Sequence, residues 1–311
     1  MFTQAYDQHF LVGGCIVIMK YLIAVIGGDA RYLELIRQLK LEENISLVLV
    51  GYDKIEQSFT GVQQSDFSEL EVGKLDAAIL PITGVDNNGK VETIFSDQQI
   101  IIDTNWFKQL KKSAVIFTGI ANDYLTKQTE QAQVNLIPLL NRDDVAIYNS
   151  IPTAEGTIML AMENTDYTIH SSNVIVTGFG RVGHTVAHKF AALGANVAVS
   201  AKSMIDLARI TEMGLTAIPL AKLTDNVSNC DLLINTIPAQ VIGKETIQQL
   251  PSHTIIIDLA SKPGGTDFAY AKKRGIKAIL AKSLPGVVAP KTAGKILAEV
   301  IKQYVNETAN S

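Results

Sequence analysis

From residue 20 onward, short apolar runs alternate with amphipathic segments along the whole chain. The apolar runs of the first half are continuous and β-branched, as strands covered on both faces should be. Between them, residues 29–43 space Leu33, Ile36 and Leu39 along one helical face. The predicted strands of this half are 21–28, 45–52, 75–83, 113–120 and 134–140.

The second half repeats the pattern. Its predicted strands are 173–178, 196–200, 231–238, 254–260 and 277–282, and its predicted helices are 182–193, 203–213, 244–250 and 266–274. Alternating strands and helices indicate parallel sheets built from right-handed βαβ units. The sequence therefore predicts an α/β protein with two doubly wound, Rossmann-like domains that face each other across a cleft.

One turn signal lies in the middle of the first half, and linker signals separate the two halves. The segment DNNGK at 86–90 predicts a hairpin-type turn, and Pro152 predicts the start of a linker helix over 153–164. A second amphipathic helix, 291–305, follows Pro290 and is expected to pack with the linker helix on the first domain. The predicted domains are 19–151 joined by 291–305, a linker at 152–170, and a cofactor domain at 171–290, with 1–18 as an N-terminal extension.

Composition excludes several classes of function. The chain has 311 residues, 47% hydrophobic and 19% charged, with a formal net charge of −4 and no basic run interleaved with aromatics. We therefore expect a globular protein that does not bind nucleic acid. The apolar run 10–19 is too short to cross a bilayer and has no preceding Lys or Arg, so no membrane association is expected.

Cysteine and histidine positions argue against disulfide and metal sites. Cys15 and Cys230 are the only cysteines and lie far apart in the sequence, which fits a cytoplasmic protein. His184 and His188 stand four residues apart on a predicted helix, but no Glu accompanies them as in H-E-x-x-H. We interpret them as helix-surface histidines and expect no metal.

The segment GFGRVG carries the strongest functional signal. Gly178, Gly180 and Gly183 satisfy G-x-G-x-x-G after a predicted strand and at the opening of a predicted helix. The first glycine allows the tight turn, the second lets a pyrophosphate approach the backbone, and the third lets helix and strand pack closely. This context predicts a dinucleotide site.

The end of the next strand indicates NADP rather than NAD. An NAD site expects an acidic residue about 20 positions after the glycines, but Ser200, Ala201, Lys202 and Ser203 occupy that place and the first carboxylate is Asp206. Lys202 and the hydroxyls would favour a 2′-phosphate, although Lys202 is alternatively a solvated loop lysine. The predicted cofactor contacts are Gly178, Phe179, Gly180, Arg181, Val182, Gly183, Ser200, Ala201, Lys202, Ser203, Asn235, Thr236, Ile237, Pro238, Asp258 and Ala260.

The first half has its own glycine turn, VIGGDARYLEL, without the G-x-G-x-x-G spacing. It is therefore not predicted to be a second dinucleotide site. Gly27, Gly28 and Arg31 are a candidate substrate pocket in which the guanidinium binds a carboxylate. The alternative is a tight turn beside a surface arginine.

The architecture resembles the two-domain dehydrogenases that include formate, glycerate and other D-2-hydroxyacid dehydrogenases, alanine dehydrogenase and adenosylhomocysteinase. The 2-hydroxyacid group uses an Arg after the fourth strand of its cofactor domain and a His near its end. The corresponding segments read DLASKPGG and LPGVVAPKTAG, with Lys262 and Lys291 instead. Ketone–alcohol hydride transfer with a histidine acid/base is therefore not expected.

Five long segments resemble the A-subunit family of dipicolinate synthase from spore-forming bacteria. They are IAVIGGDARYLELIRQL, IPTAEGTIMLAMENTDYTIHSSNVIVTGFGRVG, LARITEMG, DLASKPGGTDF and LPGVVAPKTAG, and the resemblance extends from about residue 20 to 305. It implies oxidation of dihydrodipicolinate, or of its hydroxy-tetrahydro precursor, to dipicolinate in the mother cell during sporulation, on a branch of the lysine and diaminopimelate pathway. It also implies a partner, the B subunit of dipicolinate synthase; we further expect a homo-oligomer.

Such a reaction needs cationic or hydroxyl partners for two carboxylates and an acceptor for a proton. The candidates are Arg31, Thr83, Thr118, Ser150, Thr153, Glu155, Lys262 and Lys291. We predict Arg31 and Lys291 on the carboxylates, Lys262 nearby, and Glu155 as base. Structural alternatives stay open: Glu155 or Thr153 as a cap of the linker helix, and Lys291 as the start of the terminal helix.

Two other functions remain alternatives. One is an amino-acid or hydroxy-acid dehydrogenase using NAD or NADP, which predicts activity on pyruvate-like substrates by this chain alone. The other is a non-catalytic, nucleotide-sensing partner of the B subunit, which the absence of an unmistakable general base keeps open.

Overall fold

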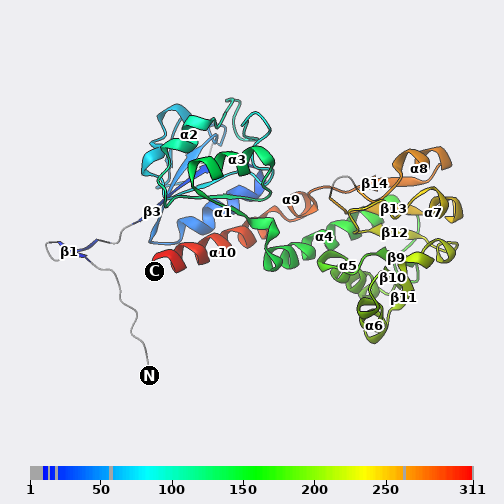
Figure 1. Ribbon diagram of the computed structural model, residues 1–311. Helices are drawn as coiled ribbons and strands as arrows, with labels where there is room; N and C mark the ends of the chain where they lie inside the picture. Colours follow the sequence, from blue (N-terminus) through cyan, green and yellow to red (C-terminus); the bar gives the residue numbers. More distant parts are fainter. Residues whose placement is uncertain (1–9, 13–14, 18–19, 56–58, 262–263, 310–311) are drawn as a thin grey trace, which may run out of the picture. The chain divides into compact units, whose positions relative to one another are not determined.

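The computed structural model describes residues 10–12, 15–17, 20–55, 59–261 and 264–309 (Figure 1). The chain folds into two compact units. Unit 1 comprises residues 1–145 and 290–311, and unit 2 comprises residues 146–289. Within the predicted extension 1–18, the described residues form a short antiparallel pair, β1 (Phe10–Val12) and β2 (Cys15–Val17).

Unit 1 contains a six-stranded parallel sheet of order β5-β4-β3-β6-β7-β8. Its strands are β3 (Tyr21–Ile26), β4 (Ile45–Val50), β5 (Gln63–Gln64), β6 (Ala77–Ile79), β7 (Val115–Thr118) and β8 (Asn135–Pro138). Its helices are α1 (Ala30–Lys40), α2 (Thr104–Gln109), α3 (Asp123–Ala132) and α10 (Pro290–Ala309), with single 3₁₀ turns at Phe67–Glu69, Val72–Lys74 and Leu139–Asn141.

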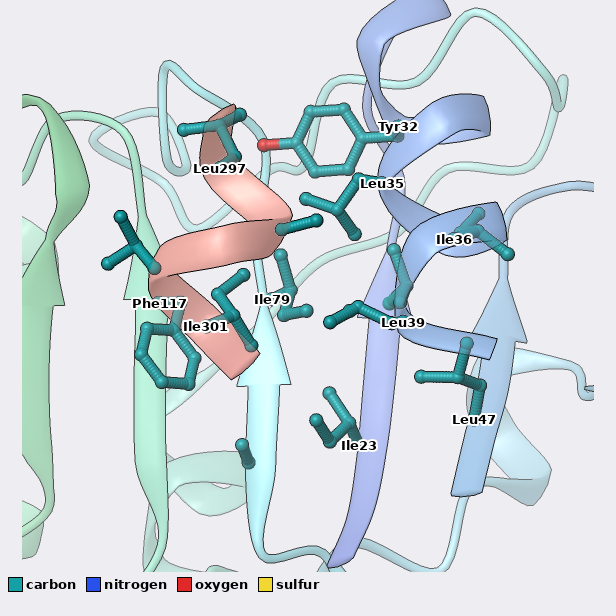
Figure 2. Packing of buried hydrophobic residues seen from close by; sticks show 14 of the residues in the cluster. Ile23, Tyr32, Leu35, Ile36, Leu39, Leu47, Ile79, Phe117, Leu297 and Ile301 are labelled. Carbon is teal, nitrogen blue, oxygen red and sulfur yellow. The ribbon is translucent and has the colours of Figure 1, made fainter. Parts of the chain in front are cut away.

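Both faces of this sheet are covered. Helices α1 and α10 lie over one face, where Leu39 of α1 and Ile301 of α10 pack above Ile23 and Phe117 of the sheet (Figure 2). Helices α2 and α3 contribute to the buried cluster on the opposite side of the sheet. Each such buried aliphatic side chain stabilises the fold by about 1.5–3 kcal/mol. The terminal helix, distant in sequence, is thus part of the core of unit 1.

Unit 2 contains a second six-stranded parallel sheet, of order β11-β10-β9-β12-β13-β14. Its strands are β9 (Asn173–Thr177), β10 (Asn196–Ala201), β11 (Thr216–Pro219), β12 (Leu232–Asn235), β13 (Ile255–Asp258) and β14 (Lys277–Leu280). Its helices are α5 (Arg181–Ala192), α6 (Met204–Glu212), α7 (Lys244–Gln249), α8 (Phe268–Arg274) and α9 (Leu284–Val288), with 3₁₀ turns at Leu220–Lys222 and Thr224–Asn226.

The predicted fold class is confirmed: two parallel sheets, each flanked by helices, account for the alternation of apolar runs. The prediction missed β5 and β11, which are edge strands. Neither strand carries a continuous apolar run, since β5 consists of two exposed glutamines and β11 has an exposed residue at each end. The predicted turn at 86–90 is confirmed, because the Gly89 N–H donates to the Asp86 carbonyl and Val85 bridges Val91 in antiparallel fashion.

The prediction that Pro152 starts a helix is wrong. Helix α4 (Asp143–Asn164) begins nine residues earlier, with Asp143 and Asp144 in its first turn, and Pro152 lies inside it. Two acidic residues favour a helix N-terminus through the helix dipole. An internal proline costs about 3 kcal/mol, and burial of Ala154 and Ala161 of α4 in the core of unit 2 offsets that cost.

None of the described helices is both long enough and apolar enough to cross a membrane.

Candidate functional site

The glycine turn of unit 2 lies where the strand order of its sheet changes direction, between the neighbouring strands β9 and β12. Open α/β sheets bind ligands in the crevice outside the carboxyl ends of their strands at such a switch point. Gly178 follows β9 directly, and Gly180 is the N-cap residue of α5. Within the described part of the chain no side-chain cap is present on α5, so its N-terminus can bind an anion.

Each glycine of this turn has different surroundings. At Gly178, where φ is +92°, a Cβ would lie 2.4 Å from Thr236 Oγ1, and at Gly183 it would lie 2.2 Å from the Gly178 carbonyl oxygen. At Gly180 a Cβ would meet no atom within 4 Å. The first and third glycines are therefore required by packing inside the protein. The second leaves open space over the helix N-terminus, which fits the close approach of a pyrophosphate.

The end of β10 lies beside this turn, since the Gly178 N–H donates to the Ser200 carbonyl. The side chains of Ser200 and Ala201 are buried, whereas Lys202 is exposed. The Ser203 hydroxyl caps α6 by accepting from the N–H groups of Ile205 and Asp206, at 3.2 and 3.4 Å. Of the two predicted hydroxyls, that of Ser200 is inaccessible and that of Ser203 caps a helix, so Lys202 is the side chain available to an anion.

A buried network joins the carboxyl ends of β9, β12 and β13. The Thr177 hydroxyl donates to Asn235 Oδ1 at 2.6 Å, and Asn235 Nδ2 donates to Asp258 Oδ1 at 2.8 Å. The Asp258 carboxylate also accepts the N–H groups of Ala260 and Gly265. Asn235 and Asp258 are 0% exposed. Their side chains thus hold the loops after β12 and β13, which is a positioning role that the sequence did not predict; contact of these residues with a cofactor remains a prediction.

The loops themselves remain accessible at several predicted positions. Thr236 donates its hydroxyl to the Thr177 carbonyl, and the Ile237 N–H donates to Asn235 Oδ1, so both follow β12 in fixed positions. Pro238 is exposed and Ala260 is buried. Lys262 lies outside the described residues. The glycine-turn residues Phe179 and Val182 are half-buried, and Arg181 is exposed in the first turn of α5.

The glycine turn of unit 1 occupies the corresponding switch point, between β3 and β6. Here the Gly28 N–H donates to the Glu92 carbonyl, and the Ile94 N–H donates to the Gly28 carbonyl. A Cβ at Gly28 would lie 2.5 Å from the ring of Tyr32. The residue that corresponds to Gly180 as helix N-cap is Asp29, whose carboxylate accepts the Arg31 N–H, so a negatively charged side chain already occupies this helix N-terminus.

Arg31 is buried, and its guanidinium already has a protein partner. Its Nε donates to both carboxylate oxygens of Asp29, at 2.9 and 3.1 Å, and its Nη2 pairs with Asp29 Oδ2. Asp29 is also the N-cap of α1 and accepts the Arg31 N–H. The predicted alternative of a surface arginine is wrong, because only 10% of the Arg31 side chain is exposed.

The remaining sequence candidates are divided between the two units. In unit 1, Arg31 and Thr83 line one pocket. The Thr118 hydroxyl is buried and donates to the Pro81 carbonyl. Lys291 is exposed in the first turn of α10, as the structural alternative predicted. In unit 2, Glu155 is exposed in the middle of α4.

The hydroxyls of α4 bond within unit 2. That of Thr153 donates to the Asn149 carbonyl, and those of Ser150 and Thr185 bond each other at 2.7 Å. The cap roles considered for Thr153 and Glu155 are wrong, because both lie in the helix interior.

Comparison with protein families assigns each half of the chain. Residues 22–140 match the model of the N-terminal domain of the dipicolinate synthase A subunit, and residues 148–262 match that of the D-isomer specific 2-hydroxyacid dehydrogenase, NAD binding domain. The dipicolinate synthase A subunit of Bacillus subtilis is 50% identical over 285 residues, which is 92% of this chain and 96% of that protein. The chain belongs to the A-subunit family of dipicolinate synthase.

Solved structures agree with this assignment. The crystal structure of the dipicolinate synthase A subunit from Bacillus halodurans matches with a TM-score of 0.89 at 48% identity, over 93% of this chain and 99% of that chain. The dipicolinate synthase A chain from Bacillus subtilis matches with the same TM-score at 47% identity, over 97% and 98%. The resemblance predicted from the sequence is confirmed, and unit 2 carries a nicotinamide-cofactor domain of the dehydrogenase type.

Proposed function

We propose that this chain is an oxidoreductase that converts dihydrodipicolinate, or its hydroxy-tetrahydro precursor, to dipicolinate with NADP as the hydride acceptor. Family membership supports the product, because the relatives are named dipicolinate synthase. The dehydrogenase NAD binding domain supports the reaction class. The same domain match fits the alternative of a hydroxy-acid dehydrogenase, but the relative that is 50% identical over 92% of this chain is named dipicolinate synthase, which favours the proposed reaction.

The observation that carries the proposal is the open space at Gly180. A dinucleotide needs a turn in which the backbone can be approached from outside, at a helix N-terminus and at a switch point of the sheet. Gly180 meets all three requirements, since it is the N-cap of α5, follows β9 and would meet no atom within 4 Å if it carried a Cβ. When bound there, the cofactor supplies the acceptor for a hydride.

The preference for NADP is proposed from charge. The residues that end β10 and begin α6 include no carboxylate before Asp206, and Lys202 is exposed among them. A 2′-phosphate is stabilised by an ammonium group, here that of Lys202. A ribose 2′-hydroxyl would instead call for an acidic acceptor, which this strand end lacks.

On the substrate side, we propose that Arg31 binds a carboxylate with the part of its guanidinium that faces away from Asp29. Lys291 and Lys262 remain proposed as further cationic partners. Glu155, an exposed carboxylate on α4, is the proton acceptor predicted from the sequence, and Glu155→Gln tests that role. We also propose that the chain acts with the B subunit, since the relative is named as a subunit. A cytoplasmic location in the mother cell and a homo-oligomer remain predictions from the sequence.

The decisive experiment follows NADPH formation and dipicolinate absorbance in one cuvette. The purified chain receives NADP⁺ and freshly prepared dihydrodipicolinate precursor, with and without the B subunit. Both signals rising together at equal rates support the proposal. Dipicolinate appearing at the same rate without NADP⁺ contradicts it and favours a nucleotide-sensing role for the glycine turn.

The cofactor preference is tested by Lys202→Glu. We expect NADP⁺ affinity to fall about 100-fold, because a charge-assisted contact is replaced by repulsion, and NAD⁺ affinity to stay equal or rise. Both affinities are measured by quenching of protein fluorescence or by calorimetry. Lys222→Glu, an exposed lysine elsewhere in unit 2, is the matched control. Unchanged NADP⁺ affinity would show that the 2′-phosphate lies elsewhere.

A further inference from the structure

Two hollows adjoin in unit 1 and share a common wall. A narrow one of about 30 Å³ is lined by Gly28, Asp29, Arg31 and residues 81–83, and reaches Glu92. A wider one of about 320 Å³ is lined by residues 83–86 and 90–92. Thr83 and Glu92 belong to both. The narrow hollow has room for a group the size of one carboxylate, and the wider one for a small ring.

The position of these hollows is one where α/β sheets bind ligands. Asp29 and Arg31 follow β3, and residues 81–83 follow β6, and these two strands are neighbours on either side of the switch point. The carboxyl ends of parallel strands lie at one edge of the sheet, so the loops that follow them meet there. The backbone of Gly28 is in turn bonded to that of Glu92 and Ile94, which fixes the segment carrying Glu92 against the turn.

Arg31 is oriented for an anion in the narrow hollow. Asp29 binds the edge of the guanidinium formed by Nε and Nη2. A guanidinium has five N–H groups in a planar fork, so the Nη1 side remains for a second carboxylate. Within the described residues no other hydrogen-bond acceptor of this guanidinium is present. Asp29 therefore neutralises the buried charge and at the same time fixes the direction in which Arg31 presents its remaining donors.

Glu92 is an exposed carboxylate held at the shared wall. Its Oε2 accepts the Thr83 hydroxyl at 3.2 Å, and its backbone carbonyl accepts the Gly28 N–H at 2.9 Å. The other acidic residue of the wider hollow, Asp86, is committed to its own turn. Hydrogen bonds from the backbone N–H groups of Lys90 and Asn88 lower the pKa of Asp86. Of these two carboxylates, Glu92 is the better placed to take a proton.

Lys90 supplies a second cation, in the wider hollow that Glu92 also lines. Its side chain is exposed and lines the wider hollow, and the described part of the chain offers it no ion-pair partner within 4 Å. A base with a cation in each of the two hollows matches a ring that carries two carboxylates and loses a proton.

We propose that these hollows are the substrate site for the six-membered dicarboxylate ring, with Arg31 and Lys90 each binding one carboxylate and Glu92 as the catalytic base. This inference rests on the proposed function. One ring C–H bond breaks and its electron pair leaves as hydride to NADP⁺. A second hydrogen leaves a neighbouring ring atom as a proton to the Glu92 carboxylate, and its bonding pair stays in the ring, which becomes aromatic. Oxidation of the ring by two electrons thus balances reduction of NADP⁺ to NADPH.

The first test is Glu92→Gln, with Glu130→Gln on the exposed face of α3 as control. The variant keeps an acceptor for Thr83 and loses only the ability to take a proton. We expect kcat of the full chain, together with the B subunit, to fall on the order of 100-fold or more. Binding of pyridine-2,6-dicarboxylate to the NADPH complex, measured by calorimetry, should be unchanged or tighter. The control should match the wild type in both.

The second test concerns the two cations. Arg31→Lys and Lys90→Gln should each weaken pyridine-2,6-dicarboxylate binding about 10-fold or more, while NADPH affinity stays unchanged. Lys108→Gln, exposed on α2, is the control. Lys90→Gln alters an exposed side chain, so it remains informative if Arg31→Lys destabilises α1.

The outcomes separate the two proposals. If Glu92→Gln keeps the kcat of the wild type, the inference is overturned while the proposed function stands. If kcat falls only in Glu155→Gln, the base lies on α4. Failure of the wild type to bind the dicarboxylate, or to form NADPH and dipicolinate together, overturns the proposed function and the inference with it. The site is supported if both cation variants bind pyridine-2,6-dicarboxylate more weakly and if Glu92→Gln has a lower kcat.

Discussion

Unit 1 and unit 2 each place a glycine turn between the first strand and first helix of a six-stranded parallel sheet, at the point where the strand order changes direction. In unit 2 the position of a Cβ at Gly180 is empty to 4 Å. In unit 1 the Tyr32 ring lies 2.5 Å from such a position at Gly28, and Tyr52 donates its hydroxyl to the Gly27 carbonyl. One fold thus provides an open turn for a dinucleotide and a closed turn beside a small pocket.

The difference arises from a few side chains and one loop. Residues 91–94 bridge to Gly28 in unit 1 and occupy its N–H group. The described loops of unit 2 form no such bridge to Gly180. A backbone N–H that already donates to a carbonyl is not available to a phosphate. The two turns also differ at the helix N-cap, which among the described residues is Gly180 without a side-chain cap in unit 2 and Asp29 with its own capping carboxylate in unit 1.

The largest expected effect concerns the glycine turn of unit 2, in which Gly183 is needed for packing and Gly180 for binding of the cofactor. Gly183→Ala should destabilise unit 2 by about 3 kcal/mol, because its Cβ would lie 2.2 Å from the Gly178 carbonyl oxygen. Gly180→Ala should change stability by less than about 0.5 kcal/mol, yet weaken NADP⁺ binding about 10-fold or more by filling the space that a pyrophosphate needs. Denaturant unfolding and calorimetric titration measure the two quantities. Equal effects of both substitutions on stability would contradict the proposed division of roles.

A smaller effect is expected in the closed turn. Gly28→Ala should destabilise unit 1 by about 2 kcal/mol, since φ is +119° and the added Cβ would meet the buried Tyr32 ring. NADP⁺ affinity of the folded protein should not change. Hydrogen exchange of peptides from each unit shows where stability is lost, and a titration checks the cofactor. Weaker NADP⁺ binding in this variant would mean that the two turns are not independent.

The smallest effect is a difference in alkaline stability. Burial raises the pKa values of the Tyr32 and Tyr52 hydroxyls in unit 1, and raises the pKa of the Cys230 thiol in unit 2 to about 12. In the folded protein these groups stay protonated, whereas in the unfolded chain they ionise above their ordinary pKa. The stabilisation of the folded state is therefore complete below the ordinary pKa, and it is lost as the pH rises toward the pKa of the folded protein. At pH 9.5 we expect ionisation of Cys230 in the unfolded chain to cost unit 2 about 1.4 kcal/mol, and each buried tyrosine to cost unit 1 about 0.2 kcal/mol.

Hydrogen exchange between pH 8 and 10.5 measures this difference, after correction for the intrinsic exchange rate. Cys230→Ala should remove the earlier loss in unit 2. Tyr32→Phe should reduce the later loss in unit 1 by the contribution of one tyrosine, since Tyr52 and Tyr21 of this unit also have raised pKa values. An onset below pH 9 in unit 1 would contradict the assignment, because no buried tyrosine ionises there in the unfolded chain.

The sequence by itself determined the fold class, the open glycine turn and the family. Continuous apolar runs mark strands that are buried on both faces, and G-x-G-x-x-G has the same local geometry wherever a strand leads into a helix. These are local properties, so the residues that carry them are adjacent in the chain. The absence of an acidic residue at the end of β10 is equally visible in the sequence.

Only the tertiary structure decided how distant residues combine. Asn235 and Asp258 were predicted as cofactor contacts, but the fold buries them in a network with Thr177, which no local pattern reveals. Pro152 has the same sequence signature at a helix start and inside a helix, and burial of α4 decided between them. Asp29 carries the ordinary sequence signal of a helix N-cap, which does not reveal its pairing with Arg31. Glu92 and Lys90 line the hollows beside this pair because the folded sheet brings the loops that carry them to the same edge.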